Sequence, residues 1–404
     1  MLSKQRLGFA LDSKRKSAVP IRQSDQKGRD MNNDGFHKLI IIALMGMLCW
    51  FGWSVTAQTP PSDLTELSLE QILGLRIVNR NVVVEGNYSL PETKQSDKWS
   101  VGYRYIRLEF SGHRDGTDNL SDSEVLFPGG AAVRTSNNYP IVPTEIRQEA
   151  HVTELGFSPN EKFSVNILVP YITQETEHIS IVPGFSDFAI HSEGIGDISV
   201  TPSLIAWKKS NHVLTLNAGL SLPVGAINET GDTPAPGSVN PLPYTMQLGS
   251  GTFDFLPGIS YFGARDRLTW GAQTLGTIRL GRNYRGYTLG NRLSLQTWLR
   301  VKAFDWMEPS MALSAQIWDR IEGVDTSFKA FALPGAFFPA SVADPIKFGG
   351  EKVSILPGIR FSCPRGALKG HTLAIGGGLP VYQRLNGPQP EEDWQINVSW
   401  NWSF

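Results

Sequence analysis

The chain ends on the stretch Trp394-Gln-Ile-Asn-Val-Ser-Trp-Asn-Trp-Ser-Phe404, in which apolar and polar residues alternate at every position. Successive side chains of a β-strand point to opposite faces, so this stretch predicts a strand with one apolar and one polar face. Four aromatic residues, the last of them a carboxy-terminal Phe, are typical of the strand that closes an outer-membrane barrel. The apolar face consists of Trp394, Ile396, Val398, Trp400, Trp402 and Phe404.

The same alternation recurs upstream in stretches that are separated by connections of two kinds. Short connections such as 158–161 and 208–211 alternate with long ones rich in Gly, Pro, Asp, Asn and Ser, such as 112–144 and 322–350. Short periplasmic turns and long outer loops are characteristic of transmembrane β-barrels. We therefore predict an all-β, closed antiparallel barrel of about 12 strands over residues 98–404. The predicted strands are 98–111, 145–157, 162–176, 195–207, 212–223, 246–263, 268–280, 291–304, 309–321, 351–362, 371–385 and 393–404.

The amino-terminal part of the chain predicts export. Residues 39–53 form the longest apolar run, and small residues precede Ala57, so residues 1–57 are predicted to be a signal peptide that is cleaved after Ala57. Met31 opens a more ordinary signal sequence, which indicates a true start there. Residues 58–97 are predicted to be a periplasmic segment with one short helix at 63–73, where Asp63 and Glu66 form a capping box.

The composition limits the partners. With 37 basic and 38 acidic residues, the formal net charge is −1, and no overall attraction to nucleic acid is expected. The expected partners are outer-membrane lipids, a small-molecule solute and the barrel assembly machinery, which would recognise the last strand. The chain is expected to be a monomer in the outer membrane of a Gram-negative bacterium. We expect no cofactor and no metal, because a single Cys follows the signal peptide and the His residues are scattered.

The alternation also predicts which charges line the lumen. We take the apolar register as the lipid-facing side, because a charge that faces lipid at mid-depth costs about 2–4 kcal/mol. On the first two strands this choice places Ile106, Leu108, Phe110, Ile146, Ala150 and Val152 outside. The side chains predicted to face the lumen are Arg107, Glu109, Arg147, Glu149, His151, Asp254, Arg279, Arg292, Arg300, Lys302 and Arg360.

These lumen charges have two interpretations. Rings of charge set the selectivity of pores, so the excess of basic residues would favour anionic or polar solutes. Alternatively, Arg107, Glu109, Arg147 and Glu149 neutralise one another and fill a narrow interior, since twelve strands lie between filled and open barrels. An enzyme is not expected. No Gly-x-Ser-x-Gly or His-Glu-x-x-His motif occurs, and a lipid-modifying site centred on His151 is the less favoured alternative.

Three prolines conflict with the strand assignment. Pro202, Pro257 and Pro357 each lie five to seven residues before a short turn, and Leu256-Pro-Gly-Ile259 is repeated as Leu356-Pro-Gly-Ile359. Proline cannot donate a ladder hydrogen bond, and lipid cannot replace that bond. We expect β-bulges at these positions.

Three glycine-rich motifs suggest a family. Gly194-Ile-Gly-Asp-Ile-Ser-Val200, Ala218-Gly-Leu-Ser-Leu-Pro-Val-Gly225 and Leu248-Gly-Ser-Gly-Thr-Phe-Asp-Phe255 together resemble outer-membrane transporters named for the MetA pathway of phenol degradation. The resemblance covers residues 150–404. It implies an outer-membrane channel for aromatic or other hydrophobic small molecules, and it names no catalytic residue.

The sequence therefore favours a channel for passive passage of small solutes, narrowed by loops 112–144 and 322–350 folding inward. A structural or ligand-binding barrel with a plugged lumen is the alternative, and a soluble secreted β-sandwich is a further one.

Overall fold

The computed structural model describes residues 98–128, 133–235 and 239–404, and the backbone of 78–79 and 82–83. The predicted signal peptide and the predicted helix at 63–73 lie outside these residues. All described residues belong to one compact unit, residues 62–404. Among them, the longest helix has four residues, and none is long and apolar enough to cross a membrane.

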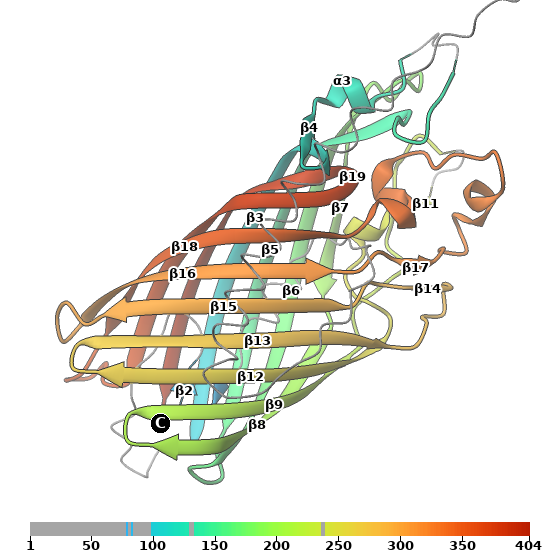
Figure 1. Ribbon diagram of the computed structural model, residues 1–404. Helices are drawn as coiled ribbons and strands as arrows, with labels where there is room; N and C mark the ends of the chain where they lie inside the picture. Colours follow the sequence, from blue (N-terminus) through green and yellow to red (C-terminus); the bar gives the residue numbers. More distant parts are fainter. Residues whose placement is uncertain (1–77, 80–81, 84–97, 129–132, 236–238) are drawn as a thin grey trace, which may run out of the picture. The chain divides into compact units, whose positions relative to one another are not determined.

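Antiparallel strands form a closed ring (Figure 1). Each pairs with its neighbour along the chain, and the last pairs with the first, so the sheet has no open edge in the ring. The ring strands are β3 (Trp99–Gly116), β5 (Ile141–Phe157), β6 (Phe163–Ser180), β8 (Ile198–Lys209), β9 (His212–Leu222), β12 (Phe253–Arg265), β13 (Leu268–Leu280), β15 (Arg292–Val301), β16 (Met307–Trp318), β18 (Gly350–Ser362) and β19 (His371–Ser403).

β19 contributes two neighbouring segments of the ring. Residues 372–385 pair with β18, whereas residues from 385 to 403 pair with β3. With β19 counted twice, the described ring contains the predicted twelve strands, and the predicted fold class is confirmed. The carboxy-terminal half closes the barrel with Trp394 opposite Glu109 and Trp402 opposite Val101.

Smaller elements extend the barrel at the end that carries the long loops (Figure 1). β7 (Asp187–Ile195) pairs with the carboxy-terminal half of β6, and β4 (Asp118–Leu120) pairs with β3. The remaining elements are β1 (Val78–Asn79), β2 (Val82–Val83), α3 (Asp122–Val125), β10 (Thr230–Gly231), β11 (Asn240–Pro241), η1 (Tyr244–Met246), β14 (Tyr287–Thr288), β17 (Glu322–Gly323), η2 (Lys329–Ala332), η3 (Ser341–Ala343) and η4 (Pro345–Lys347).

The three strand prolines are accommodated without the predicted bulges. Pro357 is opposite Met311 of β16 in the regular ladder, but on its other side the β18–β19 pairing passes from Ile355–Leu379 directly to Gly358–Gly376. The register is the same before and after this gap. The β12–β13 and β8–β9 ladders skip the same two positions at Pro257 and Pro202. Each proline therefore lies at a gap in one ladder, and the expectation of bulges there is wrong.

Small residues lie opposite the prolines. A Cβ atom on Gly276, which faces Pro257 across the β12–β13 gap, would lie 3.1 Å from the Cγ atom of that proline. The glycine therefore leaves room for the ring where the ladder is interrupted.

Candidate functional site: the barrel lumen

Burial identifies the inner face of the wall. On the second half of β19, Gln395, Ser399 and Asn401 are buried, whereas Trp394 is 37% exposed. On β15 the alternation is equally clear, with Gln296, Trp298 and Arg300 buried and Leu293 and Leu299 exposed. Within this part of the barrel, apolar side chains face outward and polar ones inward, as a lipid environment requires.

Buried pairs of oppositely charged side chains lie at the periplasmic end of the lumen. Glu308 of β16 accepts hydrogen bonds from the Nη1 atoms of Arg300 (3.5 Å) and Arg360 (3.3 Å). Both arginines are almost completely buried. Arg104 of β3 donates to Glu154 of β5 over 3.1 Å, and its side chain is fully buried. Arg104, Glu154 and Glu308 were not among the side chains predicted to face the lumen.

A second set of ion pairs lies nearer the outer end. Arg279 of β13 donates to Asp254 of β12 over 2.7 Å, and both side chains are 2% exposed. Lys352 of β18 pairs with Glu392 of β19, and both are buried. Asp254, Arg279, Arg300 and Arg360 thus lie in the interior, as does Arg292, which alternates with the outward Leu293.

The predicted register of β3 and β5 is wrong. Ile106, Leu108, Ile146 and Ala150 are completely or almost completely buried and pack on the inner face against Leu248 from the loop between β9 and β12. The outer face carries Trp99, Tyr103, Leu155 and the five side chains that were predicted to line the lumen: Arg107, Glu109, Arg147, Glu149 and His151.

These outward charges neutralise one another on the surface. Arg107 donates to Glu109 and Glu149, and Arg147 donates to Glu109 (3.2 Å) and Glu175 (3.1 Å). Arg107 is eight residues above Trp99, which is about 20 Å for a strand tilted by about 40°, close to the height of a ~25 Å apolar band. The charges therefore lie at the outer boundary of the membrane, where water is available. The outward Tyr103 hydroxyl hydrogen-bonds His151 Nδ1 over 2.6 Å.

Lys302 also differs from its prediction. β15 ends at Val301, and Lys302 lies in the short turn, where its Nζ atom is 3.0 Å from Asp305. It is exposed and does not line the lumen.

The three family motifs converge on one carboxylate. Asp197, between β7 and β8, accepts hydrogen bonds from the backbone N–H groups of Gly225 (2.9 Å) and Ser250 (2.8 Å), and from the Ser250 hydroxyl (2.7 Å). Gly225 and Ser250 are the two ends of the loop between β9 and β12. Asp197 therefore clamps this loop at its base and holds Leu248 in the lumen.

The glycines of the clamp are required by close contact. A Cβ atom on Gly225 would lie 2.6 Å from the carbonyl oxygen of Leu248, and one on Gly249 would lie 2.6 Å from Asp197 Oδ1. The sequence motifs are thus explained by backbones that pass too close together for any side chain.

The outer loops pack on one another. Tyr139 of loop 112–144 donates to Asp344 of loop 322–350 over 3.2 Å, and Lys347 donates to Asn137 over 2.7 Å. Burial raises the pKa of Asp344 and lowers the pKa of Lys347. Tyr244, Tyr287, Phe328 and Phe348 bring two further loops into the same packing. These loops therefore form one packed assembly at the outer end of the barrel.

A second apolar cluster lies inside the barrel toward the short turns. Ile205, Val213, Phe262, Ala264 and Trp298 are buried together on the inner faces of β8, β9, β12 and β15. Among the described residues, no group of three or more His, Cys, Asp and Glu side chains could hold a metal ion.

A closed barrel with an apolar, aromatic-edged outer surface is the architecture of outer-membrane proteins, because closure satisfies every backbone group that faces lipid. Residues 142–306 match the model of the family described as "Putative MetA-pathway of phenol degradation". Over these residues the family resemblance is confirmed. The matched residues contain all three motifs of the clamp, and no curated protein matches the chain.

Solved structures with a similar fold are distant in sequence. An outer membrane channel from Pseudomonas putida F1 is 10% identical with a TM-score of 0.49, and the match covers 78% of this chain and 100% of that one. The toluene transporter TbuX from Ralstonia pickettii is 9% identical with a TM-score of 0.34, over 76% and 90% of the two chains. The transport unit of the autotransporter AIDA-I from Escherichia coli is 12% identical with a TM-score of 0.36, over 79% and 93%.

Replacing Asp197 by Asn should loosen the clamp, because hydrogen bonds to a charged acceptor contribute about 1.5–3 kcal/mol each. We expect about 2–4 kcal/mol less stabilisation of the loop between β9 and β12, and faster proteolysis of residues 226–247 in intact cells. Asp305→Asn in the exposed turn is the matched control. Equal cleavage rates in the two variants would show that Asp197 is not the clamp.

Proposed function

We propose that this protein is a monomeric outer-membrane channel through which small solutes of apolar character diffuse down a gradient. The observation that carries the proposal is the inner wall. It presents the apolar cluster of Ile205, Val213, Phe262 and Trp298 beside uncharged amide and hydroxyl groups. A wall of this kind binds small organic molecules weakly enough to release them, which passive passage requires.

The proposal also gives the loops a role. The clamp at Asp197 and the packing of the outer loops narrow the outer end, so the loops select solutes by size. The family description, which names phenol degradation, supports an aromatic solute. No residue arrangement among those described favours catalysis.

Uptake by cells tests the proposal. A Gram-negative host that makes this protein should accumulate radiolabelled phenol or toluene several-fold faster than the same host without it. Ala312→Trp, which places an indole on the inner face of β16, should return uptake to the level of the host. Ala315→Trp, on the outer face of the same strand, is the matched control and should leave uptake high.

Uptake that does not depend on the protein would contradict the channel. The alternative function, a binding barrel with a plugged lumen, is favoured by the packing of Leu248 against Ile106 and Ile146 inside the barrel. In that case phenol would bind without crossing.

We further propose that the buried arginines at the periplasmic mouth give any residual ion current a preference for anions. Arg300→Glu should shift the reversal potential in planar bilayers toward cations, because it reverses a charge that faces the lumen. Lys302→Glu should leave it unchanged, since Lys302 lies outside the barrel wall in a turn. Equal shifts in both variants would contradict this assignment.

A further inference from the structure

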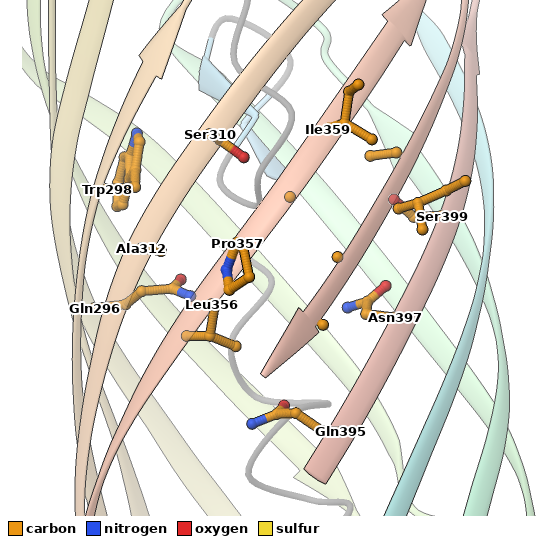
Figure 2. Close-up of a pocket in the computed structure, with 15 residues that line it drawn as sticks. Gln296, Trp298, Ser310, Ala312, Leu356, Pro357, Ile359, Gln395, Asn397 and Ser399 are labelled. Carbon is orange, nitrogen blue, oxygen red and sulfur yellow. The ribbon is translucent and has the colours of Figure 1, made fainter. Parts of the chain in front are cut away.

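A cavity of about 90 Å³ lies on the inner wall between β15, β16, β18 and β19 (Figure 2). One water molecule needs about 10–15 Å³ on this scale, so the cavity holds a group several times larger. Its centre is the gap in the β18–β19 ladder at Pro357. There Gly358, Gly376 and Gly377 expose backbone instead of side chains, and this is what leaves the wall hollow.

The lining is neutral. None of the described residues that form the cavity is charged, although Arg300 and Arg360 lie nearby toward the periplasmic mouth. Leu356, Ala312 and Trp298 supply apolar surface, whereas Gln296, Gln395 and Asn397 supply amides. A carboxylate or sulfonate would therefore have no counter-charge in the lining, and its burial would be unfavourable.

Two residues of β15 determine what fits. Gln296 and Trp298 are two positions apart on the strand, so both face the lumen, and both are buried. Figure 2 shows them together on one side of the cavity, opposite Asn397 and Gln395. Trp298 is held firmly, because its indole packs directly over Gly271 of β13, where a Cβ atom would lie 2.0 Å from it.

The side-chain oxygen of Gln296 accepts no hydrogen bond from the described residues. This Oε1 atom is buried. A buried acceptor without a partner is costly, by about 1–3 kcal/mol. A ligand that donates a hydrogen bond at this point would remove that cost, whereas a pure hydrocarbon would not.

We propose that this cavity binds a neutral, single-ring aromatic alcohol of the phenol class, with its ring against Trp298 and its hydroxyl group at Gln296. The ring satisfies the aromatic and aliphatic wall, and the hydroxyl donates to Oε1. A hydroxyl can also accept, so the match does not depend on which way the amide of Gln296 is turned. As a step in permeation, this site rests on the channel function proposed above.

Calorimetric titration of the full-length barrel in detergent with phenol, toluene and benzoate tests the site. Phenol should bind at least tenfold more tightly than toluene or benzoate. In Gln296→Leu, phenol affinity should fall about tenfold to the level of toluene, and toluene affinity should not fall. Gln316→Leu, a buried glutamine on the inner face of β16 outside the cavity, is the matched control and should bind phenol like the wild type.

Three results would overturn the site: no phenol binding by the wild type, equal phenol binding by Gln296→Leu and Gln316→Leu, or tighter binding of benzoate, which would point to the arginines. Gly376→Leu provides a second variant, because Gly376 lines the cavity from β19 and a side chain there would fill it while Gln296 on β15 is unchanged. It should abolish phenol binding. If phenol binds in this pattern but does not enter cells, the channel function is contradicted and the binding site is supported. If variants that lose phenol binding still take up phenol at the wild-type rate, the role of the site in permeation is contradicted and the channel function is supported.

Discussion

The structure depends on one constraint: a peptide group that faces hydrocarbon must find its hydrogen-bond partner within the protein. Closing the sheet through β19 and β3 meets this constraint around the ring. The interruptions at Pro202, Pro257 and Pro357 are the exceptions, and each is confined to one side of the proline, with the ladder on the other side intact. One of these interruptions is also where the wall is hollow enough to hold a ligand, so the weakest part of the ladder coincides with the candidate binding site.

A second feature is that polarity reverses along β3 and β5, toward the end that carries the long loops. Near the short turns, β3 shows Trp99 and Tyr103 to lipid and Arg104 to the interior. Nearer the outer end, the same outer face carries Arg107 and Glu109, while the inner face carries Ile106 and Leu108. Beside β3 and β5, the outer part of the barrel is therefore built like a soluble protein, with an apolar interior to which Leu248 contributes. On other strands the interior at this level holds the ion pairs Asp254–Arg279 and Lys352–Glu392. In the proposed channel, this interior and the packed loops would restrict passage, and the neutral wall below them would be the place where solute is selected.

The sequence was sufficient for the parts of the fold that depend on local pattern. Alternation and turn length predicted the strands, their number and the closing strand, because each of these is determined by neighbouring residues. The register of β3 and β5 could not be derived by assuming that apolar residues face outward, because Ile106 and Ile146 face inward and belong to an apolar core inside the barrel. The aromatic residues Trp99 and Tyr103 have the same parity as Arg107 and could have decided it. The Asp197 clamp, the cavity that Gln296 and Trp298 line, and the pairing of Arg300 and Arg360 with Glu308 depend on contacts between segments that are distant in the sequence, which no local pattern contains.

The reversal of polarity is most directly tested by spin labels at single cysteines, in a background in which Cys363 is replaced by Ser. Labels at Ile106→Cys, Arg107→Cys and Leu295→Cys in lipid vesicles would be compared for collisions with oxygen, which concentrates in lipid, and with a water-soluble nickel complex. The reversal of polarity predicts lipid exposure at 295, water exposure at 107 and protection from both at 106. Lipid exposure at 106 with protection at 107 would contradict it and would place Arg107 in the lumen.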